Sequence, residues 1–185
     1  MNDNTKIISA LKEEWDDTCH PNLYISGCGK VNATICTMNI IKEAKINNLK
    51  INTIINYGTA GSTTGVKGLV DCATFYQRDM DATPLGFKIG ETPFEDIPVK
   101  LDYSHIKNPI NKQLSCGTGD SFVTSEKGIN TDIVDMEAYA IAKVCFIHKI
   151  NFISFKYITD DGSPDDWRLN CRSGIKLFKK ILKNY

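Results

Sequence analysis

The hydrophobic and polar positions of this chain divide it into short apolar runs and longer stretches with helical spacing. The helical spacing predicts helices over residues 30–47, 137–149 and 165–183. The apolar runs predict strands at residues 22–26, 51–57, 68–78, 113–123 (a strand and then a glycine turn), 132–136 and 151–158. Residues 7–15 are ambiguous between a strand end and a first helical turn. Strands that alternate with helices indicate an α/β protein, a three-layer αβα fold around a central mixed sheet.

The first two predicted helices each have an apolar face that should meet the core. On the first helix this face comprises Val31, Ile35, Met38 and Ile41. On the second helix it comprises Ala138, Ile141, Ala142 and Cys145. Residues 79–111 contain four prolines and have the pattern of one long loop. A loop of this length is usually functional or part of an interface.

Composition narrows the class of protein. A chain of 185 residues predicts one domain, over 1–185, and its apolar fraction of 42% is that of an ordinary globule. Equal numbers of basic and acidic residues, 22 of each, leave no basic footprint for nucleic acid. We expect no membrane span and no signal peptide. Seven scattered cysteines without a CxxC pair predict reduced thiols in the cytoplasm, with neither a metal site nor a cofactor.

Two carboxylates stand where apolar strands end. Glu137 follows the strand at 132–136, and Asp160 follows the strand at 151–158. Strand ends build the sites of open α/β sheets, and two carboxylates in different surroundings can divide the work of binding and proton transfer. From the local sequence alone, Asp160 would cap a turn, and Glu137 would only make a favourable interaction with the positive, N-terminal end of the helix dipole.

Six segments in register resemble the purine nucleoside phosphorylase/nucleosidase superfamily, and most closely its 5′-methylthioadenosine/S-adenosylhomocysteine nucleosidases. The strings Ser26-Gly27-Cys28-Gly29-Lys30 and Ile54-Ile55-Asn56-Tyr57-Gly58 are similar to the family's SGxGK turn and IINTG strand end. Residues 78–87 are similar to its HDxDxTxxGY loop, with Arg78 in place of histidine. Residues 119–123, 134–142 and 158–160 are similar to its GDxFI, VEMEAxAIA and ISD segments.

The resemblance implies a nucleoside phosphorylase-like fold and hydrolysis of a purine nucleoside to a free base. Asp160 would protonate the base, and burial beside the base would favour the protonated acid. Glu137 would accept hydrogen bonds from the ribose hydroxyls while Met136 packs on the sugar. Such a carboxylate also opposes the positive charge that the sugar develops in the transition state.

The same resemblance assigns an attacking water to Glu14, Ser26 and Lys156. Lys156 stands where the family has arginine, inside an apolar strand where an unpaired lysine would be costly. Glu14 is the partner that we expect for it. The alternatives are an exposed acidic face around Glu14 and a lysine that reaches solvent from a strand edge.

Recognition of the base falls to Phe122 and Val123, and Cys28 joins them in the substrate site. Phe122 would stack on the purine, and the Val123 backbone would bind its edge, although both residues also suit an ordinary core. Leu85 and Phe87 stand where a neighbouring subunit covers the 5′-substituent in the family. The resemblance therefore implies a homodimer.

Three functions remain open on these residues. The first is a nucleosidase that uses water. The second is a phosphorylase that uses phosphate, and we disfavour it because none of Arg78, Arg168 and Arg172 falls in a segment expected to meet that anion. The third is a non-catalytic nucleoside binder. The sequence does not choose among the possible 5′-groups.

Overall fold

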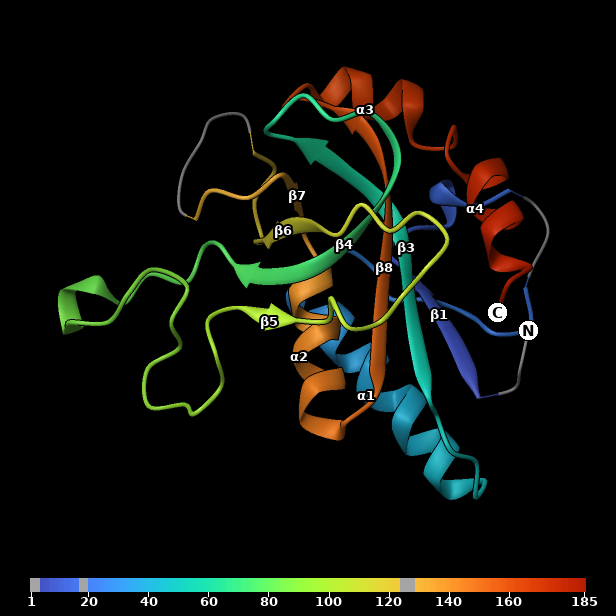
Figure 1. Cartoon of the computed structure of the whole chain (residues 1–185), viewed down its shortest axis with the longest axis horizontal. Helices are drawn as coiled ribbons and strands as arrows, with labels where there is room; N and C mark the ends of the chain where they lie inside the picture. Colours follow the sequence, from blue (N-terminus) through green and yellow to red (C-terminus); the bar gives the residue numbers. More distant parts are fainter. Residues whose placement is uncertain (1–3, 17–19, 124–128) are drawn as a thin grey trace.

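The computed structural model describes residues 4–16, 20–123 and 129–185. Within them, eight strands form one mixed sheet whose order is β2-β1-β3-β7-β6-β4-β5, while β8 pairs with both β3 and β4. The pairings β3–β7–β6–β4–β8–β3 therefore close a ring, so the sheet curls upon itself (Figure 1). The strands are β1 Thr5–Ser9, β2 Leu23–Ile25, β3 Thr53–Ser62, β4 Gly68–Gln77, β5 Leu101–Asp102, β6 Leu114–Thr118, β7 Ile133–Asp135 and β8 Asn151–Asp160.

Helices cover both faces of the sheet, so the expected three-layer αβα fold with a mixed sheet is confirmed. On one face α1 and α2 pack against each other, and α2 contacts the central strands. On the other face α4 packs over β1, β3 and β8, while α3 lies at the carboxyl end of β8. The helices are α1 Lys30–Ile46, α2 Ala138–His148, α3 Pro164–Asn170 and α4 Ile175–Leu182, with 3-10 turns η1 Lys12–Glu14 and η2 Thr83–Leu85.

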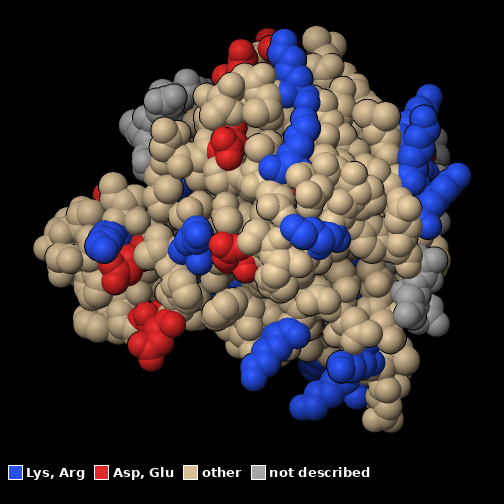
Figure 2. All heavy atoms as spheres, viewed as in Figure 1, with Lys and Arg blue, Asp and Glu red and all other residues tan. Residues whose placement is uncertain are grey.

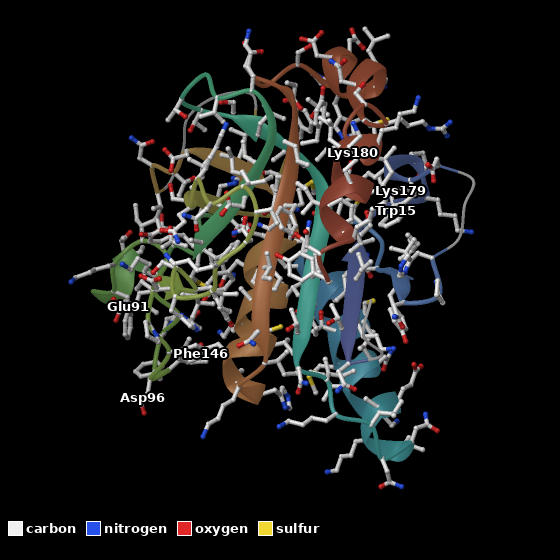
Figure 3. All side chains as sticks on the ribbon, turned by 45° about the vertical axis from the view of Figure 1, so that its right-hand side comes forward. Trp15, Glu91, Asp96, Phe146, Lys179 and Lys180 are labelled. Atoms are coloured by element: carbon white, nitrogen blue, oxygen red, sulfur yellow. The ribbon has the colours of Figure 1, made fainter. Side chains whose placement is uncertain are left out.

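Successive side chains along each strand point to opposite faces of the sheet, so the strands contribute apolar residues to two hydrophobic cores. On β3, Ile54 belongs to the core under α1 and α2, whereas Ile55 and Tyr57 belong to the core under α4. In that second core the rings of Tyr57 and Phe178 stack at a centroid distance of 4.2 Å. Trp15 closes it edge-on against both rings, beside α4 (Figure 3). The ambiguous segment 7–15 is therefore the end of β1 followed by η1.

The predicted core face of α1 is wrong by about half a turn for Val31, Ile35 and Met38, whereas Ile41 is partly buried and packs against the core as predicted. Ala33, Thr37, Ile40 and Ala44 are buried instead. Small residues on this face let α1 lie close to α2, whose Ala138, Ile141, Ala142 and Cys145 are all buried as expected. The other face leaves three large apolar side chains in solvent: Val31 (69% exposed), Ile35 (54%) and Met38 (41%).

The predicted closing helix at 165–183 is instead two helices, α3 and α4, separated by a turn at 171–174. Gly174 in this turn lies directly against β8. A Cβ atom there would come within 2.4 Å of the Tyr157 side chain, so the backbone can approach only as glycine. Tertiary contact with β8 thus interrupts a segment whose helical spacing is otherwise continuous.

Residues 79–100 leave the sheet as an arm that carries η2 and returns through β5 (Figure 1). Its side chains include Phe94 (93% exposed), the most exposed large apolar residue of the described chain, and Leu85 (72%). Glu91 and Asp96 also lie on this arm, far from α4 (Figure 3). The expected long loop at 79–111 is therefore confirmed, apart from these two short elements.

Figure 2 shows charged side chains scattered over a largely uncharged face, with basic and acidic groups next to each other at several places. Within the described residues, no helix has both the length and the apolar character needed to cross a bilayer.

Candidate functional site

A cavity of about 280 Å³ opens where several strands end at their carboxyl termini. β3 contributes Thr59 to Gly61, β7 contributes Val134 and Asp135, and β8 contributes Asp160. The segment after β6 adds Ser121, Phe122 and Val123, and α3 adds Trp167. The ends of strands that are far apart in the sequence thus meet in one wall, as α/β sheets typically arrange their sites.

Glu137 lies in this wall at the N-cap position of α2, and it is only 6% exposed. Its Oε1 accepts a hydrogen bond of 2.9 Å from the backbone N–H of Gly29, across the cavity mouth. Gly29 has φ +91°, a conformation that side-chain-bearing residues rarely adopt. Burial, and then the nearby Asp135 carboxylate, raise the pKa of Glu137 from 4.5 to about 7. The carboxyl is therefore poised to exchange a proton near neutral pH.

Lys156 is fully buried and forms an ion pair of 2.7 Å with Asp135, not with Glu14 as the sequence led us to expect. The alternative of a lysine reaching solvent from a strand edge is also wrong, because β8 pairs on both sides. Although burial opposes both charges, the Lys156 ammonium holds the pKa of Asp135 below its usual value, and Asp135 raises that of Lys156. Asp135 lines the cavity, whereas Lys156 lies behind it.

Asp160 lines the cavity at the end of β8 and makes two local hydrogen bonds. Its Oδ1 accepts from the Gly162 N–H at 2.9 Å, and its Oδ2 accepts from the Thr159 hydroxyl at 2.7 Å. It therefore caps the following turn, as the local sequence suggests, and faces the cavity as well. The two readings of this residue are compatible.

Glu14 is buried behind the cavity and accepts four hydrogen bonds. Ser9 Oγ and the Leu11 N–H donate to Oε2, and the N–H and hydroxyl of Thr59 donate to Oε1. Thr59 in turn accepts a hydrogen bond of 3.0 Å from Trp167 Nε1, and both Thr59 and Trp167 line the cavity. Glu14 thus reaches the cavity through Thr59. Glu14 itself is therefore not part of an exposed acidic face, although its neighbours Glu13 and Asp16 are exposed.

The three residues expected to hold water are not in mutual contact. The Ser26 hydroxyl donates to the Gly27 carbonyl at 2.8 Å and is not part of the cavity wall. Lys156 is engaged with Asp135, and Glu14 with Ser9, Leu11 and Thr59. Sequence order cannot show the partners of Lys156 and Glu14, because Asp135 and Thr59 lie on β7 and β3, far from them in the chain.

The residues expected to bind the base do share the cavity. Phe122 (43% exposed), Val123 and Cys28 all line it, together with Met136. Phe122 is not a core residue, so the ordinary-core reading of it is wrong. Leu85 and Phe87 lie on the arm and do not line this cavity.

Six residues of the wall with polar side-chain groups were absent from the sequence-based set: Thr59, Arg78, Ser121, Asp135, Trp167 and Arg168. Asp135 and Lys156 each place a charge inside an apolar strand. Two opposite charges in such positions are the sequence signal that could have predicted a buried ion pair. The sequence placed no arginine in a segment expected to meet phosphate, yet Arg78 and Arg168 both line the cavity.

Comparison with known proteins places this geometry in a family. The model of the phosphorylase superfamily matches residues 17–185. The chain belongs to the phosphorylase superfamily. A 5′-methylthioadenosine/S-adenosylhomocysteine nucleosidase of Staphylococcus carnosus is 31% identical over 160 residues, covering 75% of this chain and 67% of that protein. One of Haemophilus influenzae is 31% identical over 162 residues, covering 74% and 66%. The chain thus spans about two thirds of the length of these relatives.

Solved structures of this superfamily share the fold. The Helicobacter pylori 5′-methylthioadenosine/S-adenosylhomocysteine nucleosidase superposes with a TM-score of 0.79 and 16% identity, covering 98% of both chains. The futalosine hydrolase of the same organism gives a TM-score of 0.78 at 16% identity, covering 98% of this chain and 99% of that one. At these identities the likeness establishes the phosphorylase-superfamily fold.

We predict that Lys156→Met lowers the free energy of unfolding by about 3–5 kcal/mol, because it leaves the Asp135 charge buried and unpaired. Urea denaturation at pH 7 measures this change. Lys143 on α2 is the matched control, since its ion pair with Glu95 is partly exposed. Lys143→Met should cost about 0–1 kcal/mol. Equal losses in the two variants would contradict the assignment. The double variant K156M/D135N should recover part of the loss.

We also predict a pH dependence of stability that comes from Glu137. Its folded pKa of about 7 exceeds the ordinary 4.5, so the folded state keeps a proton that the unfolded state has released. The resulting stability is full below pH 4.5 and is lost as the pH rises through 7, a change of about 3 kcal/mol. Unfolding curves between pH 4.5 and 8.5 should show this decline in the wild type and a flatter profile in Glu137→Gln. Glu91→Gln on the exposed arm should keep the wild-type slope, and an unchanged slope in Glu137→Gln would refute the prediction.

Proposed function

We propose that this chain hydrolyses the N-glycosidic bond of a purine nucleoside and releases the free base. The substrate class that we propose is an adenine nucleoside such as 5′-methylthioadenosine or S-adenosylhomocysteine, named for the relatives above. One observation carries the proposal: Glu137 and Asp160 face the same cavity from different strand ends, in different surroundings. Such a pair can divide sugar binding from proton donation.

In the proposed reaction, Asp160 donates a proton to the purine as the bond to the sugar breaks. The electron pair of the C1′–N9 bond goes to the base, and the proton prevents the base from leaving as an anion. A water molecule adds its hydroxyl group to C1′, and its remaining proton passes to the solvent or to a protein acceptor. The products are a free purine and a ribose derivative.

Glu137 is proposed to bind the ribose, with Met136 against the sugar. Its Oε1 is already held by the Gly29 N–H, so the carboxylate has a fixed orientation. Hydroxyl donors from the ribose stabilise the ionised form, and that negative charge opposes the positive charge growing on the sugar. Phe122 and the backbone of Val123 are proposed to receive the base, with Cys28 beside them.

Water is proposed to bind on the Thr59 side of the cavity. Glu14 keeps its proposed role of orienting this water, through the Thr59 hydroxyl that donates to it. Lys156 contributes indirectly, by neutralising Asp135 beneath the sugar site. Ser26 is proposed to shape the turn that carries Gly29, rather than to touch the water directly.

A phosphorylase is the second candidate, because Arg78 and Arg168 line the cavity and guanidinium groups bind phosphate. Release of the base without phosphate separates a hydrolase from a phosphorylase. A protein that binds adenine but releases none from several nucleosides is a non-catalytic binder.

We also propose that the protein works in the cytoplasm, since the six cysteines of the described chain are free thiols.

We predict that Asp160→Asn lowers kcat for base release by about 10²–10⁴-fold, because the proton donor is removed. Release of adenine from 5′-methylthioadenosine, with and without phosphate, measures the effect. Asp161→Asn is the matched control, since Asp161 is exposed and adjacent. An N7-methylated purine nucleoside, whose base leaves without needing a proton, should be affected far less by Asp160→Asn. Equal losses on both substrates would exclude Asp160 as the acid.

We propose further that the active form is a homodimer. The exposed apolar face of α1 (Val31, Ile35 and Met38) and the arm with Leu85 and Phe94 offer surface that this chain leaves uncovered. Leu85 and Phe87 lie outside their own cavity, so they are free to reach a neighbour's.

Ile35→Glu should therefore convert a dimer to a monomer in sedimentation equilibrium, because it places a charge in the apolar contact. Leu177→Glu, at a half-exposed position on α4, should not. A monomeric wild type would refute the proposal.

A further inference from the structure

Arg78 is a buried guanidinium in the cavity wall that the proposed mechanism does not use. It is the residue directly after β4, lines the cavity and is only 6% exposed. Its Nη2 donates to the carbonyl and hydroxyl of Ser121, at 2.5 and 3.3 Å. Ser121 directly precedes Phe122, so Arg78 is fixed to the segment proposed to receive the base.

The chain makes room for this side chain with Gly119, which directly follows β6. A Cβ on Gly119 would lie 2.8 Å from Arg78 Cζ and 3.0 Å from both terminal nitrogens of the guanidinium. Any larger residue at 119 would displace the guanidinium. The Arg78 backbone N–H also bonds to the Thr118 carbonyl at 2.9 Å, which fixes the start of the side chain. Arg78 is therefore held in place rather than free to move.

No acidic group neutralises Arg78 within the described part of the chain. Its neighbour Asp79 is paired with Lys30 at 2.5 Å, and Asp120 also faces Lys30, at 3.5 Å. The Nε of Arg78 is buried without any hydrogen-bond partner among the described residues. An arginine cannot shed its charge in a protein, and a buried unsatisfied charge is costly. Because Nε itself is enclosed by the protein, a ligand in the cavity would lower this cost by bringing acceptor atoms or negative charge close to the rest of the guanidinium.

We propose that Arg78 donates hydrogen bonds to the purine base and stabilises the negative charge that the base acquires as it leaves. This inference rests on the proposed function and extends it. The electron pair of the broken C1′–N9 bond spreads over the ring nitrogens, which are acceptors for N–H donors. Arg78 would act on the charge that Asp160 has not yet neutralised. A preorganised donor of this kind is worth more in the transition state than in the ground state.

Position 78 is also where this chain departs from the HDxDxTxxGY pattern that it resembles, since arginine replaces histidine. A permanent cation with several planar donors differs from an imidazole in charge and in reach. The leaving-group role is therefore inferred for this chain from its own residues.

The test compares Arg78→Met with the wild type on two nucleosides, one unmodified and one N7-methylated. With the unmodified nucleoside, kcat/KM should fall by about 10²–10³-fold. With the N7-methylated nucleoside, whose base leaves neutral, kcat/KM should change by less than about threefold. Arg172→Met is the control, because Arg172 is exposed and is not among the residues that line the cavity. It should affect both substrates alike and weakly.

Equal losses on the two substrates by a variant with a native circular dichroism spectrum would overturn the inference. A phosphate-dependent reaction in which Arg78→Met chiefly raises the KM for phosphate would also overturn it, and would assign Arg78 to that anion. If Arg78→Met does not fold, Arg78→Lys keeps the charge and takes its place in the same comparison. The fall in kcat/KM that Arg78→Lys causes should then be larger for the unmodified nucleoside than for the N7-methylated one.

A binding measurement separates this inference from the proposed function. By calorimetry, the wild type should bind a purine base analogue that is anionic at pH 7 at least tenfold more tightly than a neutral isostere. If the protein binds the anionic analogue selectively but releases no base from any nucleoside, the proposed nucleosidase activity is refuted and the role of Arg78 in base binding is supported. If it releases the base but binds the anionic and neutral analogues equally, the nucleosidase activity is supported and the role of Arg78 is refuted.

Discussion

The ion pair between Lys156 and Asp135 is the constraint on which the site depends. It joins β7 and β8, two strands that do not pair with each other, across the inside of the curled sheet. Asp135 also accepts hydrogen bonds from Thr118 on β6 and from the Ala138 N–H at the start of α2. Because neither charge can remain buried alone, this one contact fixes the relative positions of three strand ends and a helix. The cavity wall takes residues from β7, from β8 and from the segment after β6, and it is completed by β3 and α3.

The two carboxyl groups of the wall differ because the fold treats them differently. Glu137 is buried beside the negative charge of Asp135 and receives one hydrogen bond, from Gly29, so its proton is held more tightly than usual. Asp160 is held at the end of β8 by a backbone N–H and a hydroxyl. Two acids of nearly the same chemistry thereby become suited to different tasks, and local sequence gives no hint of that division.

The polar residues at the cavity differ in how completely the protein satisfies their hydrogen bonds. Glu14 accepts four hydrogen bonds from the protein and does not itself line the cavity, so it acts mainly through Thr59. Arg78 is the opposite case, with a buried Nε that no described residue satisfies. A folded protein tolerates such a group where a bound molecule brings acceptor atoms or negative charge close to the rest of the guanidinium, and this contrast distinguishes the scaffold of the site from the part that meets substrate.

The sequence by itself determined the mixed αβα fold, the superfamily and the placement of Glu137, Asp160 and Phe122 in one site, because these follow from periodicity and from motifs that are continuous along the chain. Only the tertiary structure decided which face of α1 is buried, where the last helix breaks, and which carboxylate Lys156 meets. Those outcomes depend on the approach of α2 to Ala33, of β8 to Gly174, and of β7 to β8. Arg78 and Trp167 enter the site for the same reason. Contacts between residues far apart in the chain leave no periodic trace in the sequence.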